Sequence, residues 1–179
     1  MEKSYKSEII RAMQLLAKNE KTLFIGQNVI YSGAVDITGT LGNIPLSKRI
    51  EVPVFEDVQM GICNGLALEG YIPVSIFPRM DFLILAMNQL VNHLDKLGEL
   101  SCGHLQPKVI IRTIVGTKEP LNPGPQHTQD HTEGLRCMLH NIDVVRLEKA
   151  EEIVPAYKRA LASPRSTVLI ELGEKIRGG

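Results

Sequence analysis

Hydrophobic and polar positions follow two alternating patterns along the chain. Short, nearly continuous apolar runs, such as TLFIG at 22–26 and TVLIE at 167–171, are typical of buried strands. Between such runs, apolar residues recur every three or four positions, as at Ile9, Met13 and Leu16, which predicts amphipathic helices. The patterns predict strands over 22–26, 49–51, 72–76, 108–113, 143–146 and 167–171. They predict helices over 4–19, 61–69, 80–97, 131–140 and 150–163.

This alternation of strands and helices is typical of an α/β domain built on a mostly parallel sheet. In such sheets ligands bind in the loops at the carboxyl ends of the strands. We expect these loops at 26–47, 52–57, 77–81 and 114–130. The last is long and rich in Gly, Pro and His, and long loops in compact domains are usually functional. The stretch 173–179 is expected to be a flexible, frayed tail.

Composition narrows the class of protein further. The 179 residues suffice for one domain, and 20 Lys+Arg balance 20 Asp+Glu, so we expect no nucleic-acid partner. No stretch approaches the roughly 20 apolar residues that span a bilayer, and no signal peptide precedes the first helix. Cys63, Cys102 and Cys137 form no CxxC pair and predict buried free thiols. We therefore expect a cytoplasmic protein with no membrane partner.

The stretch RIEVPVFEDVQM at 49–60 ends a strand and leads into a Gly-rich apolar helix. Glu56 and Asp57 stand just before that helix, close to its free N–H groups and its positive partial charge. One interpretation is that either acid caps the helix. The other is a carboxylate held on a strand-to-helix turn and directed at a ligand. These residues alone leave both open.

Two histidines, His127 and His131, lie in PQHTQDH within the long loop. Their spacing would suit two metal ligands only on a helix, and Pro123 and Pro125 argue against a helix at His127. We therefore expect no metal site here. His127 is either a ligand-contacting residue or an exposed loop histidine. The chain contains no P-loop, no GxGxxG and no GxSxG motif.

Several motifs, taken together and in order, resemble a known family. VPVFEDVQMGICNGLALEGYIPV, MDFLILAMNQLVNHLDKL, KVIIRT and GPQHTQ are similar to the pyrimidine-binding domain of thiamine-diphosphate-dependent enzymes. The closest likeness is to the β subunit of 2-oxo acid dehydrogenases, the decarboxylating component, and the next is to the central domain of transketolases. The resemblance covers about 4–173. It implies a three-layer α/β sandwich with a mostly parallel, doubly wound sheet, and one pyrimidine-binding domain over 1–179.

The resemblance also implies roles for individual residues. Glu56 matches the glutamate that hydrogen-bonds the cofactor's aminopyrimidine ring and stabilises its imino form, which takes the proton from the thiazolium carbon. Phe82 matches the aromatic residue on which the pyrimidine stacks, although a core-facing residue is also compatible. His127 matches a histidine that contacts substrate. Arg79 replaces the usual apolar residue, which suggests an anionic substrate, or else a surface arginine. Pro123 replaces an acid that reads the sugar in transketolases, which weakens a sugar-transferring role.

Relatives bind the cofactor's diphosphate through Mg²⁺ on a separate domain marked by GDG, and this sequence contains no GDG. The resemblance therefore implies a stand-alone subunit that is inactive alone and binds the pyrimidine end of thiamine diphosphate. Mg²⁺ would sit on a separate GDG-bearing subunit, in a hetero-oligomer with two copies of each. The expected reaction on a small-molecule substrate is cleavage or transfer at the C–C bond beside a carbonyl, most like a 2-oxo acid dehydrogenase. Alternatives are transketolase-like ketol transfer by a split enzyme and a non-catalytic binding or regulatory module.

Overall fold

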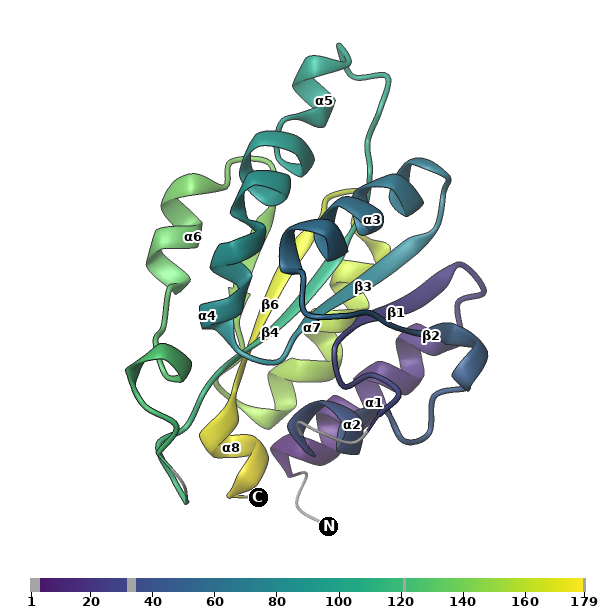
Figure 1. Ribbon diagram of the computed structural model, residues 1–179. Helices are drawn as coiled ribbons and strands as arrows, with labels where there is room; N and C mark the ends of the chain where they lie inside the picture. Colours follow the sequence, from purple (N-terminus) through teal and green to yellow (C-terminus); the bar gives the residue numbers. More distant parts are fainter. Residues whose placement is uncertain (1–3, 32–34, 121, 179) are drawn as a thin grey trace.

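One parallel sheet forms the centre of the protein. The computed structural model describes residues 4–31, 35–120 and 122–178. All neighbouring strands pair in parallel, in the order β2-β1-β3-β4-β6-β5 (Figure 1). The strands are β1 (Thr22–Gly26), β2 (Arg49–Glu51), β3 (Ile72–Phe77), β4 (Ile110–Val115), β5 (Asp143–Arg146) and β6 (Thr167–Leu172). The predicted α/β class with a parallel sheet is confirmed.

Helices cover both faces of this sheet and give three layers (Figure 1). One face carries α1 (Tyr5–Ala17), α2 (Val35–Leu41), α7 (Ala150–Ala162) and α8 (Gly173–Arg177). The other face carries α3 (Glu56–Leu68), α4 (Met80–Leu83), η2 (Ile84–Ala86), η3 (Asn88–Leu94) and α6 (Thr132–Met138). The remaining short elements are η1 (Leu46–Lys48), α5 (Leu97–Leu100) and η4 (Pro125–His127). Of these, α5 projects beyond the sheet at the top of Figure 1.

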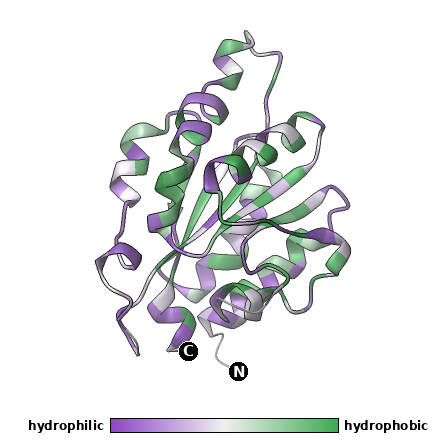
Figure 2. Cartoon of the chain, in the orientation of Figure 1, coloured by the Kyte–Doolittle hydropathy of each residue, from purple (hydrophilic) through white to green (hydrophobic). Residues whose placement is uncertain are grey.

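Successive strand residues point to opposite faces, so each central strand contributes to two separate cores. In β1, Phe24 packs in the cluster with α1 and α7, whereas Ile25 packs in the cluster with α3 and α4. Ile110 and Ile111 of β4 divide in the same way. Figure 2 shows the hydrophobic residues concentrated along the strands between the helical layers. This double burial explains why the strands read as nearly continuous apolar runs.

Two stretches predicted to be irregular form helices instead. The loop expected at 26–47 contains α2 and η1, and its residues 32–34 lie outside the described residues. The stretch expected to be a frayed tail forms α8 over Gly173–Arg177. Ile176 is buried against the core cluster of α1, and Arg177 binds Asp36 of α2. Tertiary contacts therefore order a segment whose own sequence has weak helical periodicity.

Helix boundaries also differ on the opposite face. The helix predicted from Gly61 begins at Glu56, which places both acids of the 49–60 stretch inside its first turn. The single helix predicted over 80–97 is divided into α4, η2 and η3, and η3 has π-helical geometry. Asn64 Nδ2 donates to the carbonyl of Gln89 at 3.1 Å, so a side chain from α3 bonds the backbone where the helix is widened.

The cysteines differ from the expectation at two of three positions. Cys63 is buried, and burial raises the pKa of its thiol to about 12. Cys102 and Cys137 are exposed, because they lie at the α5 protrusion and on the outer side of α6. Within the described residues, none of the helices has the length and apolar character required to cross a membrane.

Candidate functional site

The four predicted site residues all follow carboxyl ends of strands. Glu56 opens α3 after β2, Arg79 and Phe82 follow β3, and His127 lies in the loop after β4. Since the sheet is parallel, these ends share one edge, shown at the bottom of Figure 1. The topology thus brings together the segments that the sequence analysis singled out.

Phe82 and His127 are in direct contact. Their ring centroids lie 5.4 Å apart with an interplanar angle of 85°, an edge-to-face arrangement. Both side chains are partly exposed. His127 Nδ1 is nevertheless buried and has no hydrogen-bond partner among the described residues. Buried polar atoms are normally paired, so this nitrogen is an exception within the described residues.

The loop that carries His127 is fixed on both sides. At Gly116, just after β4, an added Cβ would lie only 1.8 Å from the His127 carbonyl oxygen, so the two backbones approach closely. Gln129 donates from its backbone nitrogen and from Nε2 to Asp81 Oδ1, at 3.3 and 2.9 Å. Asp81 is the neighbour of Phe82. The loop is therefore fastened to the first turn of the helix that presents the aromatic ring.

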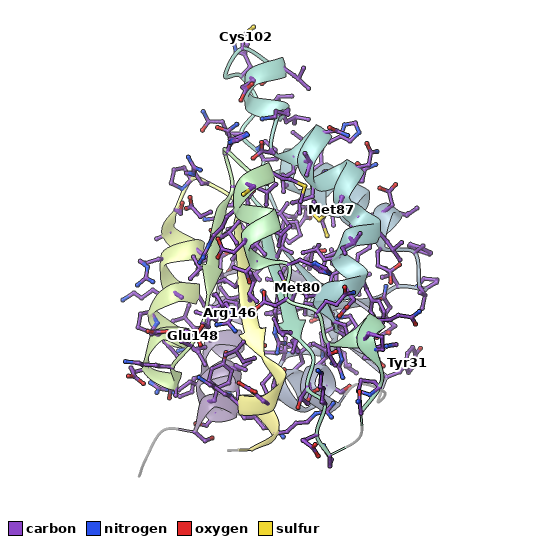
Figure 3. All side chains as sticks on the ribbon, turned by 90° about the vertical axis from the view of Figure 1, so that its left-hand side faces the viewer. Tyr31, Met80, Met87, Cys102, Arg146 and Glu148 are labelled. Carbon is purple, nitrogen blue, oxygen red and sulfur yellow. The ribbon has the colours of Figure 1, made fainter. Side chains whose placement is uncertain are left out.

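His131, the second histidine of this loop, does not join the site as a metal ligand with His127. His127 ends η4, whereas His131 precedes α6, so the two do not share a helix. The backbone nitrogen of His131 donates to the sulfur of Met80 at 3.3 Å, and Met80 is fully buried (Figure 3). The described part of the chain contains no cluster of three or more metal-ligating side chains.

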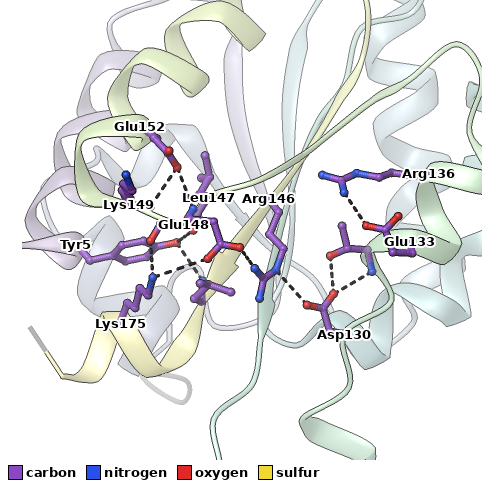
Figure 4. Close-up of polar contacts among 12 residues, drawn as sticks. Tyr5, Asp130, Glu133, Arg136, Arg146, Leu147, Glu148, Lys149, Glu152 and Lys175 are labelled. Atoms are coloured by element: carbon purple, nitrogen blue, oxygen red, sulfur yellow. Dashed lines mark hydrogen bonds and ion pairs between the residues drawn. The ribbon is translucent and has the colours of Figure 1, made fainter.

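Beyond His127, the loop ends in a group of ion pairs (Figure 4). Asp130 Oδ2 lies 3.0 Å from Arg146 Nε, and Arg146 also pairs with Glu148. Lys175 of α8 donates to the Glu148 backbone carbonyl at 2.5 Å. Burial would raise the pKa of Asp130, but hydrogen bonds from Thr132 and the charge of Arg146 hold it below its usual value. A hollow of about 360 Å³ beside this group is lined by paired charges of both signs.

Glu56 is only 4% exposed at the first turn of α3. Phe55 occupies the N-cap position without a side-chain cap, and neither Glu56 nor Asp57 forms a side-chain hydrogen bond with another described residue. Capping by a side-chain hydrogen bond, the alternative that the sequence left open, is therefore not observed at either acid. Glu56 is a buried carboxyl group near free helix N–H groups, with its side-chain hydrogen-bonding capacity available.

A buried amide network lies one turn below Glu56, and sequence reasoning missed it. Gln59 is fully buried and donates from Nε2 to Ser75 Oγ at 3.1 Å and to the Ile76 carbonyl at 3.0 Å. Its Oε1 accepts from Gln27 Nε2 at 3.0 Å. The network fastens the start of α3 to β3 and to the end of β1. The available signal was an amide on the inward face of an otherwise apolar helix.

Arg79 lies against the His127 loop and does not extend into solvent. Its side chain is 15% exposed, and its Nη1 lies 3.6 Å from Asp36 Oδ2 and donates to the Pro78 carbonyl at 2.6 Å. Burial lowers the pKa of the guanidinium, and the nearby Asp36 carboxylate opposes that shift. Its Cδ packs 3.0 Å from the position that a Cβ on Gly116 would occupy. A surface arginine, one interpretation of the sequence, does not describe this burial.

The fold is an α/β domain on a parallel sheet, with the candidate site at the carboxyl ends of its strands. The family model described as the transketolase pyrimidine-binding domain matches residues 6–176, and the chain belongs to that family. Its members are domains of thiamine-diphosphate-dependent enzymes. The resemblance stated from the motifs is thereby confirmed.

Relatives and solved structures agree with this family. The pyruvate dehydrogenase E1 component subunit beta of Mesostigma viride is 26% identical over 129 residues, covering 71% of this chain and 38% of that protein. The mitochondrial E1 subunit beta of Chaetomium thermophilum is 29% identical over 159 residues, covering 87% and 41%. The chain thus spans less than half the length of these two relatives.

Two solved structures share the fold. One, described as a split gene transketolase, inactive beta4 tetramer, has a TM-score of 0.71 at 16% identity, covering 94% of this chain and 51% of that one. The transketolase of Campylobacter jejuni also has a TM-score of 0.71, at 18% identity, covering 95% and 26%. These similarities confirm the predicted three-layer architecture.

Proposed function

We propose that this chain is the pyrimidine-binding subunit of a thiamine-diphosphate-dependent enzyme that cleaves or transfers at the C–C bond beside a carbonyl, most like a 2-oxo acid dehydrogenase. The observation that carries the proposal is Glu56, a buried carboxyl group with no side-chain partner among the described residues, at the carboxyl edge of the sheet. A buried carboxyl group in that state suits a ligand ring nitrogen with which it can share a proton.

The other side chains at this edge of the sheet fit the same half of the cofactor. When bound, thiamine diphosphate supplies the electron sink for the negative charge left by breaking the C–C bond. Glu56 holds a proton at the pyrimidine ring nitrogen, and the partly exposed face of Phe82 supports the ring. His127, held edge-on to Phe82, offers a ring nitrogen to the substrate. Arg79 presents its remaining guanidinium donors to a substrate carboxylate.

In this proposal a separate GDG-bearing subunit supplies Mg²⁺ and the diphosphate site. The sequence contains no GDG, and the relatives named above are β subunits of an E1 component. Beside Glu56, α3 exposes Val58 by 52% and Ile62 by 40%, one turn apart, as a helix that packs against another subunit would. The two kinds of subunit form a cytoplasmic hetero-oligomer with two copies of each. In this proposal the assembled complex is active, and this chain alone is inactive.

The test is Glu56→Gln in the complex reconstituted with the GDG-bearing subunit. Turnover should fall by about 10²–10⁴-fold, the usual contribution of a positioned proton-transfer group. Asp57→Asn, one residue along the same helix turn, is the matched control and should retain turnover. Assembly and melting temperature should be unchanged in both variants. Full turnover in Glu56→Gln would refute the proposal.

Two alternatives differ in what the complex does. The transketolase fold of both structural neighbours favours ketol transfer. Against it, the exposed Pro123 stands in the His127 loop where an acid that reads the sugar is expected. Supplying the complex with a 2-oxo acid or with a ketose phosphate separates these two reactions. A non-catalytic module is the other alternative. Calorimetry with thiamine diphosphate and Mg²⁺ on the reconstituted pair would then give no saturable binding.

A further inference from the structure

The C-terminal helix α8 reaches the candidate site through one buried carboxylate. Arg177 Nε lies 3.1 and 3.2 Å from the two oxygens of Asp36, and its Nη2 lies 2.8 Å from Oδ2. The Asp36 side chain is only 3% exposed. The same Oδ2 lies 3.6 Å from Nη1 of Arg79. Guanidinium groups from opposite sides of the sheet edge, one from α8 and one from the turn before α4, therefore share a single acid.

The guanidinium groups of Arg79 and Arg177 and the carboxylate of Asp36 together carry a net charge of +1. A buried carboxylate is costly without partners, and Arg177 satisfies both of its oxygens in a fork geometry. The fork also fixes the plane of the carboxylate. Arg79 lies near the same Oδ2 at a longer distance, while it donates to the Pro78 carbonyl. The position of Arg79 thus depends on how Arg177 holds Asp36.

Arg79 in turn lies beneath the loop that carries His127. Gly116 separates the two, since a Cβ there would meet the Arg79 Cδ at 3.0 Å and the His127 carbonyl oxygen at 1.8 Å. A shift of the Arg79 side chain toward Asp36 would draw its guanidinium away from the face that meets a ligand. The sequence places Arg177 far from this site, and only the fold brings it there.

We propose that Arg177 and Asp36 are positioning residues for Arg79, so that α8 sets the anion-binding side of the site. Without Arg177, Arg79 is the remaining ion-pair partner of the buried Asp36 carboxylate among the described residues. Arg79 then moves from a shared, 3.6 Å contact to a full ion pair and is withdrawn from substrate. The structural part stands on this chain alone, and its consequence for a substrate carboxylate rests on the proposed function.

The structural part is tested on the full chain by NMR of arginine Nε–Hε groups, with the Arg79 signal assigned by Arg79→Lys. In Arg177→Gln we expect a shifted Arg79 signal and a severalfold change in its proton exchange with water. Arg177→Lys keeps the charge without the fork and should give a smaller change in the same direction. It also serves as the test if Arg177→Gln does not fold. An unchanged Arg79 signal in a folded Arg177 variant would overturn the proposal.

The matched control is Arg165→Gln. Arg165 also pairs with an aspartate, Asp143, at 3.0 Å, but both side chains are 46% exposed and lie near the amino ends of β5 and β6. The Arg79 signal should not change in this variant. A change as large as in Arg177→Gln would mean that any lost surface charge moves the signal, and would also overturn the proposal.

The functional part uses the reconstituted complex with pyruvate as the 2-oxo acid probe. In Arg177→Gln the KM should rise about tenfold while kcat stays within about twofold, as expected when one ground-state contact of about 1.4 kcal/mol is lost. An unchanged KM would overturn the link from α8 to substrate binding. Failure of the Glu56→Gln test would instead refute the proposed function and leave the NMR result standing.

Discussion

The imidazole of His127 meets the ring of Phe82 edge-on, with centroids 5.4 Å apart. Phe82 follows β3 and His127 follows β4, and these strands are paired neighbours in the sheet. The contact is therefore a direct product of parallel topology, which ends adjacent strands at the same edge. Aromatic pairs of this kind contribute about 0.5–1.5 kcal/mol beyond their buried area. The orientation of the imidazole and the position of Phe82 are thus coupled.

Replacing Phe82 should weaken cofactor binding more than it weakens the fold. In Phe82→Leu, loss of the stacking face should raise the dissociation constant of thiamine diphosphate in the complex about tenfold, since stacking on an aromatic side chain contributes about 1–3 kcal/mol. Phe82→Tyr retains the ring and should retain the affinity. Calorimetric titration measures both variants. Equal affinity in wild type and Phe82→Leu would assign Phe82 to the core instead.

A methyl group at Gly116 should displace the His127 loop. In Gly116→Ala the new Cβ would lie 1.8 Å from the His127 carbonyl oxygen, so the backbone must move. We expect the free energy of unfolding to fall by about 1–3 kcal/mol, the usual cost of overpacking. Gly42→Ala is the control, because a Cβ there would meet no atom within 4 Å. Urea denaturation of the chain measures both, and equal stability of the two variants would contradict the close approach.

Periodicity predicted a mostly parallel sheet and placed the loops that hold Glu56, Arg79 and His127 at one edge, because the carboxyl ends of parallel strands share an edge. Phe82 was identified only through the family resemblance. The hydrophobic pattern did not predict α2 or α8. Those helices are short and are ordered by contacts distant in sequence, such as Arg177 with Asp36. The start of α3 was also missed, since Phe55 at its N-cap lacks a capping side chain. The roles of the four residues stay predictions until the variants are measured.

A charged pair inside the sheet should be essential to stability. Arg112 Nε and Nη2 donate to Glu171 Oε1 and Oε2 at 3.0 and 2.8 Å, with both side chains fully buried, and Tyr157 also donates to Oε1 at 2.7 Å. Glu171→Gln leaves a buried guanidinium without its counter-charge, so we expect a loss of about 3–5 kcal/mol in the free energy of unfolding.

The exposed pair between Arg136 and Glu133 provides the comparison. Glu133 is 81% exposed, and Glu133→Gln should change stability by less than about 1 kcal/mol. The double variant Arg112→Met with Glu171→Leu should recover part of the loss, because apolar residues of similar size often replace a buried pair without cost, although the Tyr157 hydroxyl then lacks its acceptor. Denaturation by urea measures all three. A Glu171→Gln variant as stable as Glu133→Gln would mean that water reaches the pair.

Asp95 should make the stability of the protein depend on pH in the acid range. Its Oδ1 accepts from the backbone nitrogens of His140 and Asn141 at 3.0 and 2.7 Å, and its Oδ2 lies 2.9 Å from Lys96 Nζ. Burial would raise the pKa of Asp95, but these contacts lower it below the ordinary value. The group therefore stabilises the fold fully above the unfolded-state pKa of about 3.9, and that contribution is lost as pH falls through the lower folded-state pKa.

Asp95→Asn removes the charge and keeps the shape of the side chain. At pH 7 the variant should be less stable than wild type by about 1.5 kcal/mol, the lower range for a hydrogen bond to a charged group. The difference should shrink once the pH falls below the ordinary aspartate pKa, because the unfolded wild-type chain then binds a proton at Asp95 while the folded protein does not, and it should be gone below the lower folded-state pKa. Urea denaturation between pH 7 and the acid range measures this difference in stability. Asp143→Asn is the control, because Asp143 is an exposed aspartate paired with Arg165. A difference that stayed constant at every pH would show that the charge of Asp95 contributes nothing and that the lost stability arises from packing.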